Sequence, residues 1–400
     1  MEEEKQEEVV KGECMQSEAQ EEGFISFLFK ADAKEYFKIW IVNITLTILT
    51  LGIYSAWAKV RTNRYFYANS YLNGTNFEYN AKPKRILYGR TIVVLFYALF
   101  LLFSDYLAML SVAGFIVALF LALLPWLLRQ AISFKLKNTS YRNIPFRFSA
   151  KTRSFYFLVI GGILLIIAIP AGLAILSKFA PGFAGFLSFF ATIFIFVILL
   201  PSLYRRYKLL VINNTHYGET SFSFTASKRD VIWVFLKMFL LTVVITVAIG
   251  IITYMSIESV NATFGSIDNF KAILAQNSVF HFLSLFTTLI LYLFTSGLYK
   301  GVADAFLSNL SRNHTVIANG KFKGTIHPLQ LGLISATNAL LLLFSLGLLY
   351  PWTKIRYMRY KLANTHFFCN NYDQFTSVGY EKSNPLGEET LDFFDIDIGF

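Results

Sequence analysis

The 400-residue sequence has only two cysteines and lacks the short motifs that mark common catalytic and nucleotide-binding sites. Cys14 and Cys369 lie near opposite ends of the chain, so neither a disulfide framework nor a cysteine-based zinc site is supported. No GxxxxGK[ST] loop, HExxH helix or GxSxG turn is present. The sequence therefore predicts no enzyme activity, no catalytic residue, no cofactor and no bound metal.

Charged residues are also scarce: they make up 15% of the chain, whereas 55% is hydrophobic. A bilayer-spanning helix needs about 20 consecutive apolar residues. The first such run is long enough for two helices, with Asp105 at a turn on the far membrane surface, because burying an unpaired carboxylate is unfavourable. The sequence predicts an all-α polytopic membrane protein, a transmembrane helix bundle with six spans in runs 91–128, 155–177, 183–203, 231–256 and 279–299.

The formal net charge of +11 is unevenly distributed. Residues 1–23 contain nine Glu and residues 377–400 contain six acidic residues, and we expect both tails to be disordered. The basic residues fall in short segments between the apolar runs. By the positive-inside rule these segments face the cytoplasm, and they are residues 57–90, 129–153, 204–229, 300–323 and 354–361.

The chain contains an internal repeat. WAKVRTNRYFYAN (57–69) matches WTKIRYMRYKLAN (352–364) at seven positions of identical spacing. Asn43 and Gly52 precede the first copy by the same intervals at which Asn338 and Gly347 precede the second. A repeat shows which features the architecture needs.

Weaker copies of the same plan lie between these two. Each ends a basic helix at an Asn-Thr or Asn-Ser turn and continues with alternating aromatic residues such as Phe77-Glu78-Tyr79, a period typical of a strand. Phe322-Lys323-Gly324 opens the last copy. The sequence predicts pseudo-repeated helices with short cytoplasmic β/aromatic segments between them, in units 24–76, 77–145, 146–221, 222–321 and 322–376.

Two further apolar stretches, 39–56 and 329–350, belong to the terminal copies. If both crossed the membrane, the two equally basic copies of the Trp motif would lie on opposite faces, against the positive-inside rule. We therefore expect both stretches to be re-entrant or tightly bent. An arrangement with eight spans is the alternative.

Two sets of polar residues are candidate sites. The recurring basic residues could bind phosphate or anionic lipid headgroups, or could simply anchor the protein at the membrane surface; they are Lys59, Arg61, Arg64, Lys354, Arg356 and Arg359. Uncharged groups in the terminal copies could line a polar path; they are Asn43, Asn338, Gly52 and Gly347.

The histidines that adjoin the Asn-Thr turns, His216, His314 and His366, suggest a metal site only weakly, because no carboxylate accompanies them and a turn at the membrane surface explains them as well. Two functions remain open. One is a facilitative transporter or channel for a small solute. The other is a module that binds anionic membrane lipids or partner proteins through its basic cytoplasmic face. Nucleic acid is not an expected partner.

The segment TLGIYSAWAKVRTNRYFYANSYLNGTNFEYNAKPKRILYGR (50–90), preceded by FKADAKEYFKIW, resembles the YjgN family of bacterial inner-membrane proteins. The resemblance covers residues from about 24 to 372 and leaves the acidic tails outside. It implies a multi-pass protein of the inner membrane. It implies no reaction, ligand or active residue, because the family is a domain of unknown function.

Overall fold

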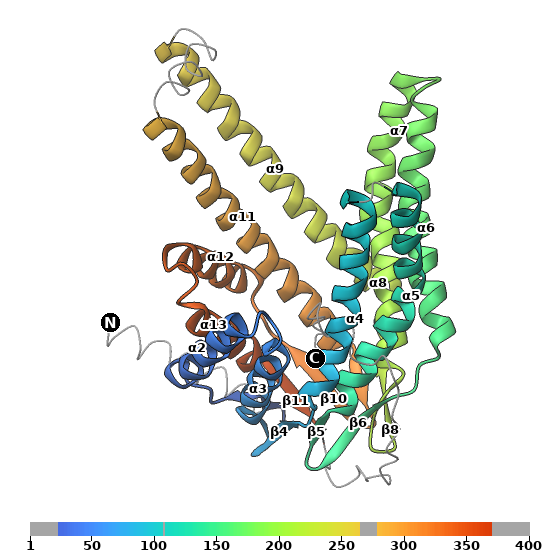
Figure 1. Ribbon diagram of the computed structural model, residues 1–400, viewed down its shortest axis with the longest axis vertical. Coiled ribbons are helices and arrows are strands. Elements are labelled where there is room, and N and C mark those ends of the chain that lie inside the picture. The colour runs from blue at the N-terminus through green and yellow to red at the C-terminus, as the bar shows by residue number, and fades with distance from the viewer. Residues whose placement is uncertain (1–22, 107–108, 265–277, 370–400) are drawn as a thin grey trace.

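The computed structural model describes residues 23–106, 109–264 and 278–369, and its helices rise from one side of a ring of short strands (Figure 1). The two acidic tails expected to be disordered, 1–23 and 377–400, lie outside the described residues except for Gly23.

In the described part of the chain, eleven strands form one antiparallel sheet, so the prediction of an all-α fold is wrong. The strands have only two to five residues, and many of them pair with segments far away in the sequence, so each gives little local signal. The alternating aromatic segments predicted as strands are parts of β4, β6 and β8. The strands are β1 (Ile25–Ser26), β2 (Leu28–Phe29), β3 (Ser70–Leu72), β4 (Thr75–Tyr79), β5 (Thr139–Tyr141), β6 (Ile144–Phe148), β7 (Thr215–Tyr217), β8 (Thr220–Phe224), β9 (Thr315–Ile317), β10 (Gly320–Gly324) and β11 (Thr365–Phe368).

The sheet closes on itself. Its order is β1-β11-β10-β9-β8-β7-β6-β5-β4-β3-β2, and the two strands at its ends are consecutive in the chain. Phe27 joins β1 to β2 and donates its amide to the Thr365 carbonyl at 2.9 Å. One extended segment thus joins β11 to β3, and closure leaves no long free edge for another chain to pair with.

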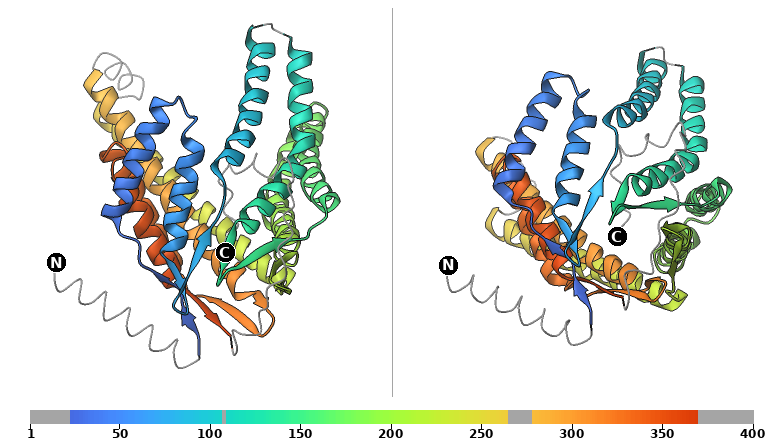
Figure 2. Two further views of the ribbon diagram at one scale, coloured as in Figure 1. Left: turned by 60° about the horizontal axis from the view of Figure 1, so that its bottom comes forward. Right: turned by 90° about the horizontal axis from the view of Figure 1, so that it is seen from below.

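The helices also form a ring. Each contacts the next one around the ring, and α13 contacts α2, which closes it (Figure 2). The helices are α2 (Ala33–Leu49), α3 (Ser55–Ala68), α4 (Pro83–Leu101), α5 (Leu110–Lys137), α6 (Thr152–Leu176), α7 (Pro181–Phe194), α8 (Leu200–Ile212), α9 (Lys228–Phe264), α11 (Ser278–Asn313), α12 (Pro328–Phe344) and α13 (Tyr350–Ala363), with π-helical turns η1 (Leu102–Tyr106) and η2 (Ile195–Leu199).

Among the described residues, six helices are long and apolar enough to cross a membrane, in the number and order that the sequence predicts. They run from Pro83 to Asp105 and over 110–137, 152–176, 185–212, 228–251 and 285–313. Asp105 is exposed in η1, at the end of α4.

The terminal stretches 39–56 and 329–350 turn back on themselves. Leu51 and Gly52 have positive φ values of 50° and 91°, and Leu346 and Gly347 repeat this turn with 51° and 85°. Both helical hairpins start and end at the strand ring, so the two copies of the Trp motif lie on the same side. Both stretches are thus tightly bent, and this arrangement does not fit the eight-span alternative, which puts the two motifs on opposite faces of the membrane, because one sheet cannot lie on both faces.

The Asn-Thr turns connect helices to strands through a repeated set of hydrogen bonds. The Asn side chain donates to the carbonyl four residues earlier at 2.7–2.8 Å in four units, and His314 takes its place in the other, with Nδ1 3.0 Å from the Leu310 oxygen. The hydroxyl of the next residue, Ser or Thr, donates to the following carbonyl at 2.6–2.9 Å. These bonds satisfy carbonyls that the end of a helix leaves unpaired.

One backbone hydrogen bond fixes the register of all five units. The residue after each main strand donates its amide to the carbonyl of a turn residue at 2.8–3.0 Å; the donors are Lys30, Asn80, Ser149, Thr225 and Thr325. The last copy is therefore opened by Gly324-Thr325-Ile326 and not, as predicted, by Phe322-Lys323-Gly324. Phe322 misled the alignment because it is the equivalent of Phe77, two residues before the aromatic position that opens the other copies.

Candidate functional site

Aromatic side chains line the concave side of the strand ring. Five phenylalanines share one position, three residues before the amides just described: Phe27, Phe77, Phe146, Phe222 and Phe322. Strands two apart in a flat sheet are separated by roughly 9.5 Å. The ring centroids are closer, at 6.1 Å for Phe27–Phe77, 6.2 Å for Phe146–Phe222 and 6.4 Å for Phe222–Phe322, so the side chains converge toward the axis of the ring.

A second set of side chains lies on the strands between these phenylalanines, and four of its members are paired directly opposite a phenylalanine on the neighbouring strand. Its members are 3–6% exposed: Leu72, Tyr141, Tyr217, Ile317 and Phe367. The Tyr217 hydroxyl donates to the Tyr141 carbonyl at 2.9 Å, and the Tyr141 hydroxyl donates to the Leu72 carbonyl at 2.8 Å. Burial raises the pKa of both phenols, so they remain neutral donors. The two sets of side chains pack into one apolar cluster inside the strand ring.

The helix ring has a wall one helix thick. Residues two apart on a helix point to nearly opposite sides. On α4, Leu95 and Tyr97 are 57% and 62% exposed, and on α6, Leu164 and Ile166 are 61% and 40% exposed. Both the outward and the inward faces of these helices are therefore apolar and uncovered by other parts of the described chain.

The structure divides the predicted phosphate-binding residues. Arg64 donates to the carbonyls of Tyr79 and Ala81, each at 3.3 Å, and Arg359 donates to Ala31 at 3.1 Å. The Tyr79 carbonyl is at the end of β4, and those of Ala81 and Ala31 lie two residues beyond the ends of β4 and β2. The other units use Arg129, Arg205 and Asn309 in the same way, at 2.7–3.1 Å, on the carbonyls of Ala150, Ala226 and Ile326. The equivalent acceptors of the five units are at most 1% exposed, so these donors hold each helix to its strand; they are Ala31, Ala81, Ala150, Ala226 and Ile326.

The remaining predicted basic residues are not brought together into one site. Arg356 donates to Thr337 at 2.9 Å and to Asn338 at 3.3 Å, and its guanidinium lies 5.3 Å from the Trp352 ring centre. Arg61 is exposed, and among the described residues it donates no hydrogen bond. Lys59 and Lys354 are partly buried, one in each terminal hairpin, so the set is spread over two hairpins.

The predicted polar path is divided between the two terminal hairpins. Asn43 is 4% exposed and donates to the Ala58 carbonyl at 3.4 Å, and Asn338 is 7% exposed and donates to the Thr353 carbonyl at 3.1 Å. Each amide thus joins the two helices of its own hairpin. Gly52 and Gly347 lie in the turns at the hairpin tips. The two asparagines therefore connect the helices of each hairpin, and the two glycines form the turns.

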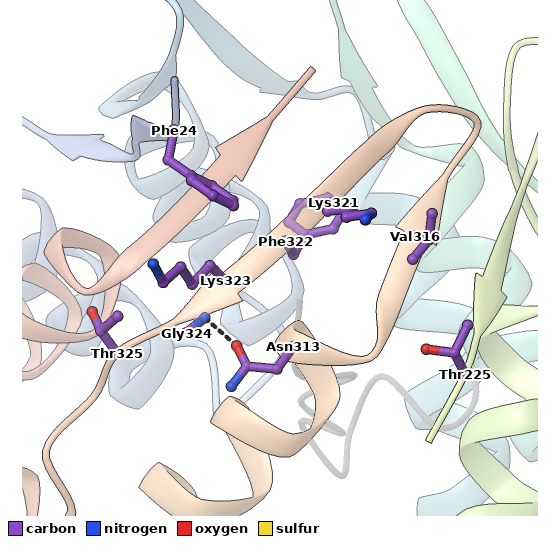
Figure 3. Close-up of a pocket in the computed structure, with 9 residues that line it drawn as sticks. All are labelled: Phe24, Thr225, Asn313, Val316, Lys321, Phe322, Lys323, Gly324 and Thr325. Carbon is purple, nitrogen blue, oxygen red and sulfur yellow. Dashed lines mark hydrogen bonds between the residues drawn. The ribbon is translucent and has the colours of Figure 1, made fainter. Parts of the chain in front are cut away.

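A shallow pocket of about 600 Å³ lies over β9 and β10 (Figure 3). Side chains alternate between the faces of a strand. Lys321 and Lys323 therefore lie on the outer face, opposite Phe322. The Lys323 ammonium is 5.1 Å from the Phe24 ring centre, and the lysines are the charged groups among the lining residues, which include Thr225, Asn313 and Thr325.

A charged cluster between α11 and α13 was not found from the sequence. Asp304 accepts hydrogen bonds from Lys361 at 3.0 and 3.1 Å, from Ser308 at 3.1 Å and from the Tyr357 hydroxyl. The Lys361 side chain is only 7% exposed. The available sequence signal for this cluster was a single acidic residue, Asp304, which follows the apolar run 279–299.

The histidines occupy separate positions. His366 accepts or donates through both ring nitrogens, to Ser26 at 2.9 Å and Thr325 at 3.1 Å, and burial together with nearby Lys323 lowers its pKa. His314 Nε2 lies 3.5 Å from Asp230. In the described part of the chain, no group of three or more His, Cys, Asp or Glu is arranged to hold a metal ion.

Comparisons with known proteins identify the family. Residues 25–393 match the family described as "Bacterial protein of unknown function (DUF898)", so most of the C-terminal acidic segment lies inside the family match, contrary to the sequence expectation. The chain is 27% identical over 371 residues to the inner membrane protein YjgN of Salmonella typhimurium strain LT2, covering 85% of this chain and 87% of the relative. It is 25% identical over 378 residues to YjgN of Escherichia coli K12, covering 90% and 93%. No solved structure matches. The chain belongs to the DUF898 family, whose relatives include YjgN, and is a multi-pass protein of the bacterial inner membrane.

Proposed function

We propose that the protein is a facilitative transporter or channel in which a small amphipathic solute moves along the common axis of the two rings. The observation that carries the proposal is that strands and helices both close around one axis. A packed bundle would bury a core at membrane depth. Here only 0–17% of the most apolar 18-residue stretch of each spanning helix is buried.

The chemistry of the wall narrows the kind of solute. The inward faces of the tall helices carry apolar side chains, which would not replace the water around a small ion. The cytoplasmic end is rich in basic residues, which attract anions. This combination suits a molecule with an apolar body and one polar or negatively charged end.

The helices on one side of the helix ring are short. The contiguous helices α12, α13, α2 and α3 have 17, 14, 17 and 14 residues. They are roughly 21–26 Å long at 1.5 Å per residue, whereas α9 has 37 residues and rises well beyond them (Figure 1). The tips carry Leu51 and Leu346, which are 95% and 91% exposed. An amphipathic molecule could enter the ring from the bilayer over this side.

The basic cytoplasmic face supports a second, compatible proposal. We propose that anionic membrane lipids contact the exposed Arg61, and that Lys59 and Lys354 contribute through their positive charge. Each basic residue near an anionic surface contributes about 1 kcal/mol. Since Arg64 and Arg359 are engaged with strand carbonyls, we exclude them from this contact.

The proposal is tested with full-length protein in lipid vesicles. We expect protein-dependent uptake of a dansylated amino acid, an amphipathic anion, and no protein-dependent potassium flux, because the wall offers no hydrated path. Empty vesicles and vesicles with heat-unfolded protein are the controls. Uptake equal to these controls would contradict transport, and potassium flux would contradict the apolar path.

A further inference from the structure

We propose that the acidic N-terminal segment Met1–Glu22 docks on the basic pocket over β9 and β10, with Lys321 and Lys323 as its principal contacts. Met1–Glu22 contains nine Glu and two Lys. It is the part of the chain that precedes the first described residue.

The acidic segment is covalently connected to a residue of the pocket. Phe24 lines the pocket, and a Cβ on Gly23 would lie 3.1 Å from the Phe368 ring, so the chain enters at the pocket's edge. Glu22 and Glu21 are only two and three residues from Phe24. An extended chain spans about 3.3–3.6 Å per residue, so further glutamates also reach both lysines.

Charge and shape favour an acidic peptide as the occupant. The pocket is broad and shallow, with two lysines on one face of β10 and hydroxyl and amide groups of Thr225, Asn313 and Thr325 around them (Figure 3). Lysines are flexible point charges that accept carboxylates without strict geometry. The counterparts of Lys321 in the other four units are the uncharged residues Ser26, Asn76, Pro145 and Ser221, so the pair of lysines is particular to one side of the ring.

The interaction should be weak for each ion pair and still effective for the whole segment. Each exposed ion pair contributes little and is screened by salt. Tethering compensates, because a short linker gives a millimolar effective concentration. The docked segment would cover part of the basic face and compete there with anionic solutes or lipids.

The test uses the native Cys14 in full-length protein that carries Cys369→Ser. A bimane fluorophore on Cys14 is quenched when a tryptophan lies close to it. One variant has Val316→Trp, in the pocket, and its matched control has Tyr71→Trp, the counterpart position on β3. We expect emission at least about twofold lower in the Val316→Trp protein, given the millimolar effective concentration.

Three further arms make the result specific. Raising the salt concentration and introducing Lys321→Glu with Lys323→Glu should each restore the emission, whereas neutralising the acids of residues 378–400 should not. Equal emission from the two tryptophan variants would overturn the proposal. Quenching that ignores salt and charge reversal, or that depends on residues 378–400, would overturn it as well.

Discussion

Replacing Arg64 with methionine distinguishes a structural arginine from a lipid-binding one. Arg64 donates to two strand carbonyls, and the acceptor residues Tyr79 and Ala81 are 3% and 0% exposed. Arg64→Met leaves both carbonyls without this charged donor. A buried acceptor left unsatisfied costs about 1–3 kcal/mol. The long 3.3 Å distances and the exposure of Arg64 itself place the expected loss at the lower end, about 1–2 kcal/mol.

Arg61→Met is the matched control, since Arg61 lies three residues earlier on the same helix and is exposed. The free energy of unfolding is measured in lipid bicelles, and binding to anionic vesicles is measured by flotation. We expect Arg64→Met to lower stability and leave lipid binding intact. We expect Arg61→Met to leave stability unchanged and to weaken binding to anionic vesicles. If Arg64→Met is as stable as the wild type but no longer binds anionic vesicles, the structural assignment is refuted.

Three other predictions concern packing and charge. Gly301→Ala places a Cβ 2.7 Å from the Gly332 Cα and should cost about 1–3 kcal/mol by separating α11 from α12, whereas Gly250→Ala, with nothing within 4 Å, should be neutral in the same unfolding assay. Asp304→Asn should destabilise the protein by leaving the buried Lys361 without its carboxylate, and adding Lys361→Met should restore part of the loss; equal stability of the single and double variants would contradict this. Because burial lowers the pKa of His366 below its usual 6.5, its neutral form supports the fold above that pH, and stability should fall as the pH drops through 6.5 toward the lower folded value. His366→Gln should flatten this slope in pH-dependent unfolding, and an unchanged slope would assign it to another group.

Local patterns were sufficient to predict the helices but not the sheet that organises them. The six spans follow from uncharged runs, and the terminal hairpins follow from the conflict between two basic Trp motifs and opposite membrane faces. Ring closure depends on contacts such as Ser26 with His366, which are 340 residues apart. The sequence of a strand of only two to five residues does not predict which distant strand it pairs with.

The candidate site residues show the same limit. The spacing of Arg64 and Arg359 correctly marked them as repeated features, but their acceptors are backbone carbonyls, which no side-chain pattern reveals. Asn309 lies at the same helix position as these arginines but is not basic, and Arg129 and Arg205 lie one turn earlier on their helices, so the repeat is clear only in three dimensions. Asp304 was overlooked because its partner Lys361 is 57 residues away.

The most direct test of the proposed axis is the uptake of the dansylated amino acid when the aromatic layer of the strand ring is opened. Phe77 packs on Phe27 and Tyr141, with ring centroids 6.1 and 4.8 Å away, so Phe77→Ala removes one side of the constriction. Phe183→Ala, on α7 and 58% exposed, is the matched control. We expect faster uptake for Phe77→Ala than for the wild type and Phe183→Ala, which should be equal. Equal uptake for all three folded proteins would contradict passage along this axis.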